Sequence, residues 1–126
     1  MDVSIVIPFL NESPNLLPLC EEIKAAMAPT GKQYEVLFID DGSTDDGCEL
    51  LEKARADMPQ IKVVSFRRNF GQTAAMVAGL DYAEGEVVVT LDADRQNDPA
   101  DIPAMLDKID EGYDMVCGWR FDRQDT

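Results

Sequence analysis

Two acidic side chains, two residues apart, stand where a short apolar run ends. Asp92 and Asp94 follow the run Val87–Leu91, and Gln96 adds a neutral oxygen two residues further on. Mg²⁺ and Mn²⁺ prefer oxygen ligands, usually one or two carboxylates completed by water and phosphate. Inside a strand the two carboxylates would repel each other, but where the chain turns they can converge on a cation. An acidic turn that caps the next helix is the plainer interpretation; a second acidic pair at another strand end favours the cation site.

That second acidic pair is Asp40 and Asp41, which ends another apolar run, Tyr34–Ile39. A turn followed by a helix, with Ser43 or Thr44 as the capping hydroxyl, accounts for part of this segment. Two adjacent carboxylates are more than a turn requires, and one of them can accept a hydrogen bond from a base N–H or a ribose hydroxyl. We therefore expect the segment to form a turn and also to contact a nucleotide.

Three arginines lie at further strand ends: Arg67 and Arg68 after the third apolar run, and Arg120 after the fifth. The planar guanidinium group donates two parallel hydrogen bonds, which suits phosphate. Arg120 could neutralise a diphosphate opposite the metal, or it could pair with Asp122, and both interpretations stay open.

These side chains require elements that bring them to one edge. Short apolar runs alternate with segments of helical periodicity. We expect strands at 3–8, 34–39, 61–66, 87–91 and 115–118, and helices from Pro14 to Met27, at 45–57, at 71–82 and from Pro99 onward. Ser13 is the expected N-cap of the first helix, with Pro14 at its first position. This alternation predicts a three-layer α/β/α domain with a mainly parallel sheet, whose ligands bind at the carboxyl ends of the strands. The helix over 71–82 is apolar nearly all round, so we expect it to be covered on most sides.

Composition narrows the function classes. The chain has 126 residues, enough for one domain, and a net charge of −14 from 25 acidic and 11 basic residues. Such a charge repels nucleic acid, whereas a diphosphate can still bind if a divalent cation lies between the two. No apolar run approaches the ~20 residues of a membrane span, and the first residues do not form a signal peptide, so we expect a soluble, cytoplasmic domain. The chain has three cysteines, no histidine and no CxxC, which argues against zinc and for reduced thiols.

Taken together, these segments resemble the family-two glycosyltransferases of the GT-A fold. The resemblance covers the whole chain through IVIPFLNE at 5–12, FIDDGSTD at 38–45, RRNFGQTAAMVAGLDYAEGE at 67–86, TLDADRQNDP at 90–99 and GWR at 118–120. RNFGQ, LDADRQNDP and EGYDMVCGWR together resemble the branch that acts on polyisoprenyl phosphates. That branch includes the dolichol-phosphate mannosyltransferases and bacterial enzymes that load glucose or modified arabinose.

The resemblance implies a role for each matching position. Asp92, Asp94 and Arg120 would serve catalysis, the two acids together with Gln96 by holding Mg²⁺ or Mn²⁺ and Arg120 by contacting phosphate. The nucleotide-sugar pocket would also include Pro8, Leu10, Glu12, Ile39, Asp41 and Ala93, with Ile39 and Asp41 at the base and ribose. Two departures from the family pattern are Leu10, where an aromatic residue is frequent, and Cys-Gly-Trp-Arg at 117–120, where Gly-Ser-Arg is common.

The implied reaction moves a sugar, with inversion, from a UDP- or GDP-sugar to undecaprenyl or dolichyl phosphate. A phosphate monoester acceptor is largely a dianion at pH 7 and needs little help from a general base. The alternatives are a transferase acting on a polysaccharide or glycolipid hydroxyl, and a nucleotide-sugar-binding fragment without activity. Since the family's domain is longer, we expect residues 1–126 to be its truncated N-terminal part. We also expect the whole protein to lie at the cytoplasmic face of a membrane, and a homo-oligomer is left open.

Two other α/β classes fit less well. A phosphoacceptor receiver domain needs an acidic pair after the first strand, an aspartate after the third and a lysine after the fifth. The chain has Asn11-Glu12, Ser65-Phe66-Arg67 and Trp119-Arg120 at those places. A nucleotidyltransferase would need a glycine-rich, lysine-containing loop after the first strand, and PFLNESPN is not such a loop.

Overall fold

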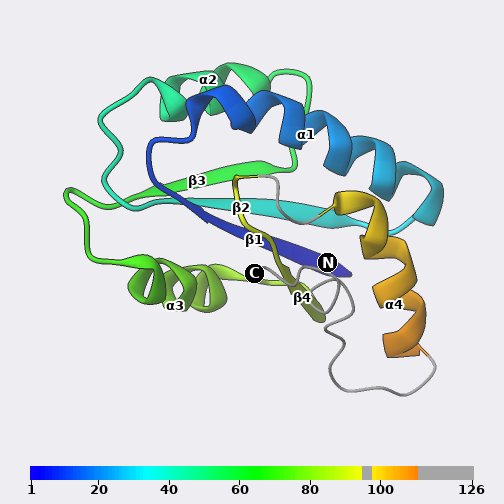
Figure 1. Ribbon diagram of the computed structural model, residues 1–126. Helices are drawn as coiled ribbons and strands as arrows, with labels where there is room; N and C mark the ends of the chain where they lie inside the picture. The colour runs from blue at the N-terminus through cyan, green and yellow to red at the C-terminus, as the bar shows by residue number, and fades with distance from the viewer. Residues whose placement is uncertain (95–97, 111–126) are drawn as a thin grey trace, which may run out of the picture.

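The computed structural model describes residues 1–94 and 98–110, in which strands and helices alternate (Figure 1). The strands are β1 (Val3–Phe9), β2 (Tyr34–Asp40), β3 (Ile61–Ser65) and β4 (Val87–Thr90). The helices are α1 (Ser13–Met27), α2 (Gly47–Ala54), α3 (Gln72–Tyr82) and α4 (Ile102–Asp110), with 3₁₀ turns at Ala28–Thr30 and Pro99–Asp101. The predicted α/β alternation is confirmed over these residues. The expected strand at 115–118 lies outside them.

The order of the strands creates a crevice in the sheet. All described strands are parallel, in the order β3-β2-β1-β4. The chain moves outward from β1 to β2 and β3 and then returns to the other side of β1 for β4. Such a reversal of strand order is where open α/β sheets bind ligands, outside the carboxyl ends of the strands. A receiver domain places its third strand beside the first, so this order also excludes that class.

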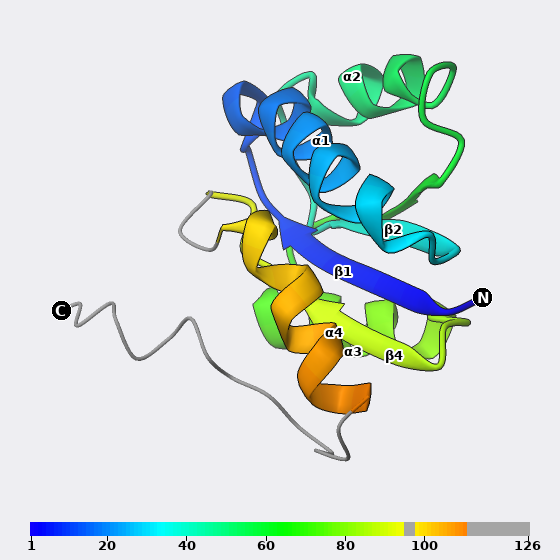
Figure 2. The same ribbon diagram turned by 90° about the vertical axis from the view of Figure 1, so that its right-hand side faces the viewer.

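The thicker helical layer, formed by α1, α2 and α4, covers one face of the sheet (Figures 1 and 2). Alternate strand residues point to this face, because side chains along a strand alternate between its two sides. They form a buried core with one side of α1, and its fully buried members include Ile5, Ile7, Leu16, Leu19, Ile23 and Phe38. None of the described helices, of which α1 is the longest at 15 residues, is long and apolar enough to cross a membrane.

The opposite face is covered, among the described residues, by α3 alone (Figure 1). Gly79 lets this helix approach β1 closely, since an added Cβ there would lie 2.3 Å from Val6 Cγ1. The expectation that α3 is covered on most sides is wrong: Val77 is 51% exposed, Leu80 50% and Tyr82 58%. A helix that is apolar all round does not show in its sequence which side meets the sheet, and here that side carries small residues.

Both predicted capping arrangements differ from the observed ones. The helix expected at 45–57 spans Gly47–Ala54, and neither Ser43 nor Thr44 caps it. Instead, Asp45 accepts hydrogen bonds from the N–H of Gly47 at 3.0 Å and from the N–H of Ser13 at 3.0 Å. One carboxylate therefore satisfies backbone donors at the start of both α2 and α1, and Ser13 is the first residue of α1, not its cap.

A buried polar cluster secures the connection between α3 and β4. Glu35 is 1% exposed and accepts hydrogen bonds from Ser4 Oγ, from Lys62 Nζ at 2.8 Å and from the N–H of Glu84 at 2.8 Å. The N–H of Gly85 donates to Ser4 Oγ at 2.7 Å. The cluster thus fixes residues 84 and 85 at the amino ends of β1 and β2, away from the crevice.

Candidate functional site

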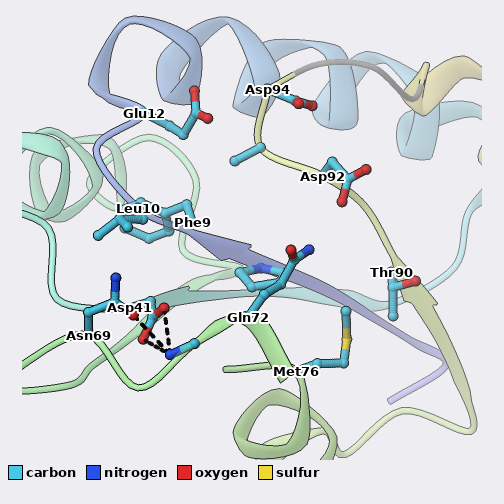
Figure 3. Close-up of a pocket in the computed structure, with 13 residues that line it drawn as sticks. Phe9, Leu10, Glu12, Asp41, Asn69, Gln72, Met76, Thr90, Asp92 and Asp94 are labelled. Atoms are coloured by element: carbon cyan, nitrogen blue, oxygen red, sulfur yellow. Dashed lines mark hydrogen bonds between the residues drawn. The ribbon is translucent and has the colours of Figure 1, made fainter. Parts of the chain in front are cut away.

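A cavity of about 710 Å³ opens at the carboxyl ends of β1, β2 and β4 (Figure 3). This volume lies within the ~300–1,000 Å³ that small-molecule sites occupy. Its lining comes from every strand end around the crevice and from the start of α3: Pro8, Phe9, Leu10, Glu12, Asp41, Asn69, Gly71, Gln72, Met76, Thr90, Asp92, Ala93 and Asp94.

The end of β1 and the turn after it form the middle of the cavity wall. Phe9 is buried, whereas Leu10 is 38% exposed and presents an apolar side chain to the cavity. The turn passes through Asn11, whose φ of +54° is in the left-handed region. Glu12 follows, and its Oε1 accepts a hydrogen bond from Asn15 Nδ2 at 2.8 Å, which orients the carboxylate at the start of α1.

The two acids at the end of β2 have different surroundings. Asp40 does not line the cavity, and its oxygens accept hydrogen bonds from the N–H of Ser43 at 2.7 Å and from Cys48 Sγ at 2.8 Å. Asp41 does line it, and accepts from the N–H of Phe70 at 2.8 Å and of Gly71 at 3.1 Å. A carboxylate has about four lone-pair positions, so Asp41 can hold the start of α3 and still accept a bond from a ligand.

Asp92, Ala93 and Asp94 form the opposite flank of the cavity, after β4 (Figure 3). The sequence predicts the acids at 41, 92 and 94 at one edge of the sheet, and they do share one cavity. The end of β1 separates Asp41 from the other two, because β2 and β4 lie on opposite sides of β1. The cavity therefore has two acidic flanks.

The β4 flank has the donor chemistry that a divalent cation requires. Asp92 and Asp94 provide carboxylate oxygens two residues apart. Within residues 1–94 and 98–110, no group of three or more His, Cys, Asp or Glu side chains is placed to hold a metal ion. One or two carboxylates with water and phosphate completing the shell is the usual arrangement for Mg²⁺, so the residues present fit an ion that binds together with a diphosphate.

Seven of the ten predicted binding residues line the cavity: Pro8, Leu10, Glu12, Asp41, Asp92, Ala93 and Asp94. Ile39 does not, because its side chain is fully buried under α3 with Val6, Leu37 and Ala75. Gln96 and Arg120 lie outside the described residues. Of the other arginines, Arg68 stacks over the ring of Phe70, with Cζ 4.8 Å from the ring centroid, and neither Arg67 nor Arg68 lines the cavity.

Sequence reasoning missed the lining that comes from α3. Gln72 and Met76 are four residues apart in this helix and so lie on the same side of it, where they face the cavity. Asn69 and Gly71, just before α3, also line the cavity. The missing information was which side of α3 faces the crevice, and its all-round apolar composition does not supply that.

Comparisons with known proteins show what the whole chain resembles. The family described as Glycosyl transferase family 2 matches residues 4–126. An undecaprenyl-phosphate 4-deoxy-4-formamido-L-arabinose transferase of Klebsiella pneumoniae subsp. pneumoniae is 46% identical over 125 residues, which are 98% of this chain and 38% of that protein. The protein of the same name from Edwardsiella ictaluri is 45% identical over 126 residues, with the same two coverages. The chain thus spans 38% of the length of these curated relatives.

Solved structures show the same fold. S. aureus TarS 1-349 in complex with UDP-GlcNAc aligns with a TM-score of 0.76 and 28% identity, over 88% of this chain and 32% of that one. The mannosyltransferase PcManGT from Pyrobaculum calidifontis, in complex with GDP-Man and Mn²⁺, aligns with a TM-score of 0.66 and 29% identity, over 73% and 27%. The predicted GT-A fold and the resemblance to transferases that use a polyisoprenyl phosphate are both confirmed. The chain belongs to glycosyl transferase family 2.

Proposed function

We propose that this chain binds the donor in an inverting glycosyltransferase that moves a sugar from a nucleoside-diphosphate sugar to a polyisoprenyl phosphate. The observation that carries the proposal is the two-sided cavity at the strand-order reversal, with Asp41 on one flank and Asp92 and Asp94 on the other. The names of the curated relatives, which act on undecaprenyl phosphate, support the choice of acceptor.

The two flanks suit the two ends of a nucleotide. On the β2 side, Asp41 can accept a hydrogen bond from a base or ribose, and Asn69 adds an amide beside it. Met76 and Leu10 provide apolar surface between the flanks, against which a base can pack. On the β4 side, two carboxylates would repel a bare diphosphate, so this flank requires a cation between protein and ligand.

Mg²⁺ or Mn²⁺, held by Asp92 and Asp94 with Gln96 as a third oxygen donor, would stabilise the negative charge that the departing diphosphate develops. The Mn²⁺ and GDP-Man named with PcManGT support this assignment. Arg120 would contact the phosphates. The chain's own residues would orient the donor so that its anomeric carbon faces the acceptor.

A phosphate acceptor fits the chemistry of this chain. The chain contains no histidine that could act as a general base, and a phosphate monoester needs little help from one because it is already largely a dianion at pH 7. A hydroxyl acceptor would need a positioned carboxylate as general base. Lipid-linked phosphate would place the reaction at the cytoplasmic face of a membrane.

Calorimetric titration of the chain with UDP and with GDP, each with and without Mn²⁺, tests donor binding. We expect Mn²⁺-dependent binding of one nucleotide, lost by tenfold or more in Asp94→Asn, since one carboxylate ligand and its charge disappear. Asp107→Asn removes an equal charge from the exposed side of α4, outside the cavity, and should bind as the wild type does. Unchanged metal-dependent affinity in Asp94→Asn would remove Asp94 from the metal site.

The acceptor is tested separately, with radiolabelled UDP- and GDP-sugars and the longer protein of which this chain would be part. Transfer to undecaprenyl or dolichyl phosphate is the expected result. Transfer only to a saccharide or glycolipid hydroxyl would replace the proposed acceptor and leave the donor site intact. Binding without transfer to either acceptor would mark a nucleotide-sugar-binding protein.

A further inference from the structure

The turn after β1 contains a backbone conformation that needs an explanation. Among the described residues, Asn11 is the one non-glycine residue with positive φ, at +54°. Most side chains avoid this region, and Asn tolerates it better than nearly all others. Asn11 stands between Leu10 and Glu12, both of which line the cavity, while Asn11 itself does not. Its conformation therefore sets how two neighbouring residues of the site are presented.

Hydrogen bonds from a distant loop hold Asn11 in place. Its N–H donates to Ser43 Oγ at 2.9 Å, and its Oδ1 accepts from the N–H of Thr44 at 2.8 Å. The same Oδ1 lies 3.3 Å from both Thr44 Oγ1 and the N–H of Asp45, which also donate to it. The turn after β1 is thus bound to the loop after β2 by both the backbone and the side chain of one residue.

The loop after β2 is bound in turn to the segment after β3. Asp41 accepts hydrogen bonds from the N–H of Phe70 and of Gly71. Gly42, with φ of +88°, packs so closely that an added Cβ would lie 2.6 Å from the backbone C of Arg68. The three strand ends therefore form one connected wall. The N–H of Asp41 bonds to the carbonyl of Phe9 at 2.9 Å, and Asn11 extends this connection from the end of β1 into the turn that follows it.

We propose that Asn11 is a positioning residue for the donor cavity, holding Leu10 and Glu12 in place through its left-handed backbone and its bonds to residues 43–45. This inference rests on the proposed function, because it concerns the same cavity. Asn11 is exposed, so its hydrogen bonds contribute little to the stability of the whole domain. Its effect is on the shape of the wall, and it should show in ligand affinity more than in melting temperature.

Three substitutions separate the backbone from the side chain. Asn11→Gly keeps positive φ accessible and removes Oδ1, so it should fold and weaken Mn²⁺-dependent nucleotide binding about fivefold, the effect of roughly one hydrogen bond. Asn11→Asp keeps an acceptor and tolerates this φ, so its affinity should stay within about twofold of the wild type. Asn11→Ala loses both the Oδ1 acceptor and the tolerance of positive φ, and should weaken binding by tenfold or more.

The control is Thr30→Ala, at the opposite end of the sheet. Thr30 Oγ1 donates to the carbonyl of Met27 and accepts from the N–H of Lys32, so its loss also removes a side-chain bridge within a turn. Thr30→Ala should lower the melting temperature slightly and leave affinity unchanged.

The readouts are the dissociation constants of UDP and GDP with Mn²⁺ and the melting temperature of each variant. Weaker binding in Asn11→Gly, restored in Asn11→Asp, supports the inference. If the wild type binds a nucleotide and Asn11→Gly binds it equally well, the inference about Asn11 is overturned and the proposed function is not. Affinity that falls in Thr30→Ala as much as in Asn11→Gly also overturns it, because the loss would then follow stability. Failure of the wild type to bind either nucleotide overturns the proposed function.

Discussion

Cys48 shows how the carboxylate of Asp40 is used inside the fold. The thiol is half-buried, and its Sγ donates to Asp40 Oδ2 at 2.8 Å. Burial, followed by the hydrogen bond to this carboxylate, raises the pKa of Cys48 to about 11, because both disfavour the thiolate. The thiol therefore supports the loop after β2 as a neutral donor.

Alkylation should show this suppressed reactivity. At pH 8 a thiol with a pKa of about 11 is roughly 100-fold less ionised than a thiol with the ordinary pKa of 9.0, and the thiolate is the reactive form. We expect iodoacetamide to label Cys48 about that much more slowly in the native chain than in guanidinium, followed by mass spectrometry of its peptide. Equal rates in the two conditions would show that the bond to Asp40 does not protect the thiol.

Glu35 is the buried charge on which the α3–β4 connection depends. Burial by itself would raise the pKa of this carboxyl, but hydrogen bonds from Lys62, Ser4 and the N–H of Glu84 outweigh it and hold the pKa below its ordinary value. The stabilisation is therefore complete above the unfolded-state pKa and is lost as pH falls through the lower, folded-state pKa.

The variant Glu35→Gln should reduce the free energy of unfolding by about 2 kcal/mol at pH 7, since charge-assisted hydrogen bonds are lost and the new amide meets the Lys62 ammonium. Urea unfolding of both proteins between pH 7 and pH 3 measures the difference. The difference in free energy of unfolding should stay constant near neutral pH and become smaller below the ordinary carboxyl pKa of 4.5. A difference that stays constant down to pH 3 would contradict the assigned role of the charge.

At the scale of the elements, Asp45 connects two helices through their amino ends. Its oxygens accept hydrogen bonds from the N–H of Ser13 in α1 and from the N–H of Gly47 in α2, both at 3.0 Å. A carboxylate at the start of a helix accepts a hydrogen bond from an otherwise unpaired backbone N–H, and its negative charge interacts favourably with the helix dipole. One side chain thus sets how α1 and α2 meet above the sheet.

Asp45→Ala should lower the free energy of unfolding by about 1–2 kcal/mol, the cost of a lost helix cap. Asp45→Asn keeps one acceptor oxygen and should lose about half as much. The matched control is Asp57→Ala, an exposed acid after the end of α2, which should change stability by no more than about 0.5 kcal/mol. Equal effects of Asp45→Ala and Asp57→Ala would show that Asp45 does not act as a cap.

The elements themselves could be predicted from the sequence because each depends on local pattern. The strand expected at 3–8 is the buried strand Val3–Phe9, and the helix expected from Pro99 starts at Ile102, after a 3₁₀ turn that begins at Pro99. The bond from Asp45 to the start of α1 could not be predicted, since Asp45 lies 32 residues from Ser13 and rules for caps consider only neighbours along the chain. The exposed side of α3 could not be predicted for a related reason. Which side of this helix is buried depends on how it packs against the sheet, and that contact joins residues far apart in the chain.

At the scale of the whole molecule, the candidate site followed from one rule about parallel sheets. Asp41, Asp92 and Asp94 could be assigned to one cavity because the carboxyl ends of parallel strands share an edge. Their division into two flanks follows from the order β3-β2-β1-β4, which depends on pairing between distant strands. Ile39 precedes Asp41 by two residues, yet it is buried under α3 and does not reach the cavity.

The net charge of −14 gives the whole chain a field that opposes an anionic ligand and attracts the cation that must accompany it. Salt weakens this field, since the Debye length falls from about 10 Å at 0.1 M to about 3 Å at 1 M. Without divalent cation, UDP binding to the chain should therefore strengthen several-fold as NaCl rises from about 0.05 to 0.5 M, opposite to the loss shown by proteins that bind nucleic acid.

With saturating Mn²⁺ the same salt series should change affinity little, because the ion offsets most of the charge on the diphosphate. Titrations in EDTA and in Mn²⁺ at each salt concentration compare the two cases. If metal-free affinity instead fell with salt, local cationic groups would dominate binding. That result would contradict the proposal that a diphosphate binds beside Asp92 and Asp94 only with a divalent cation.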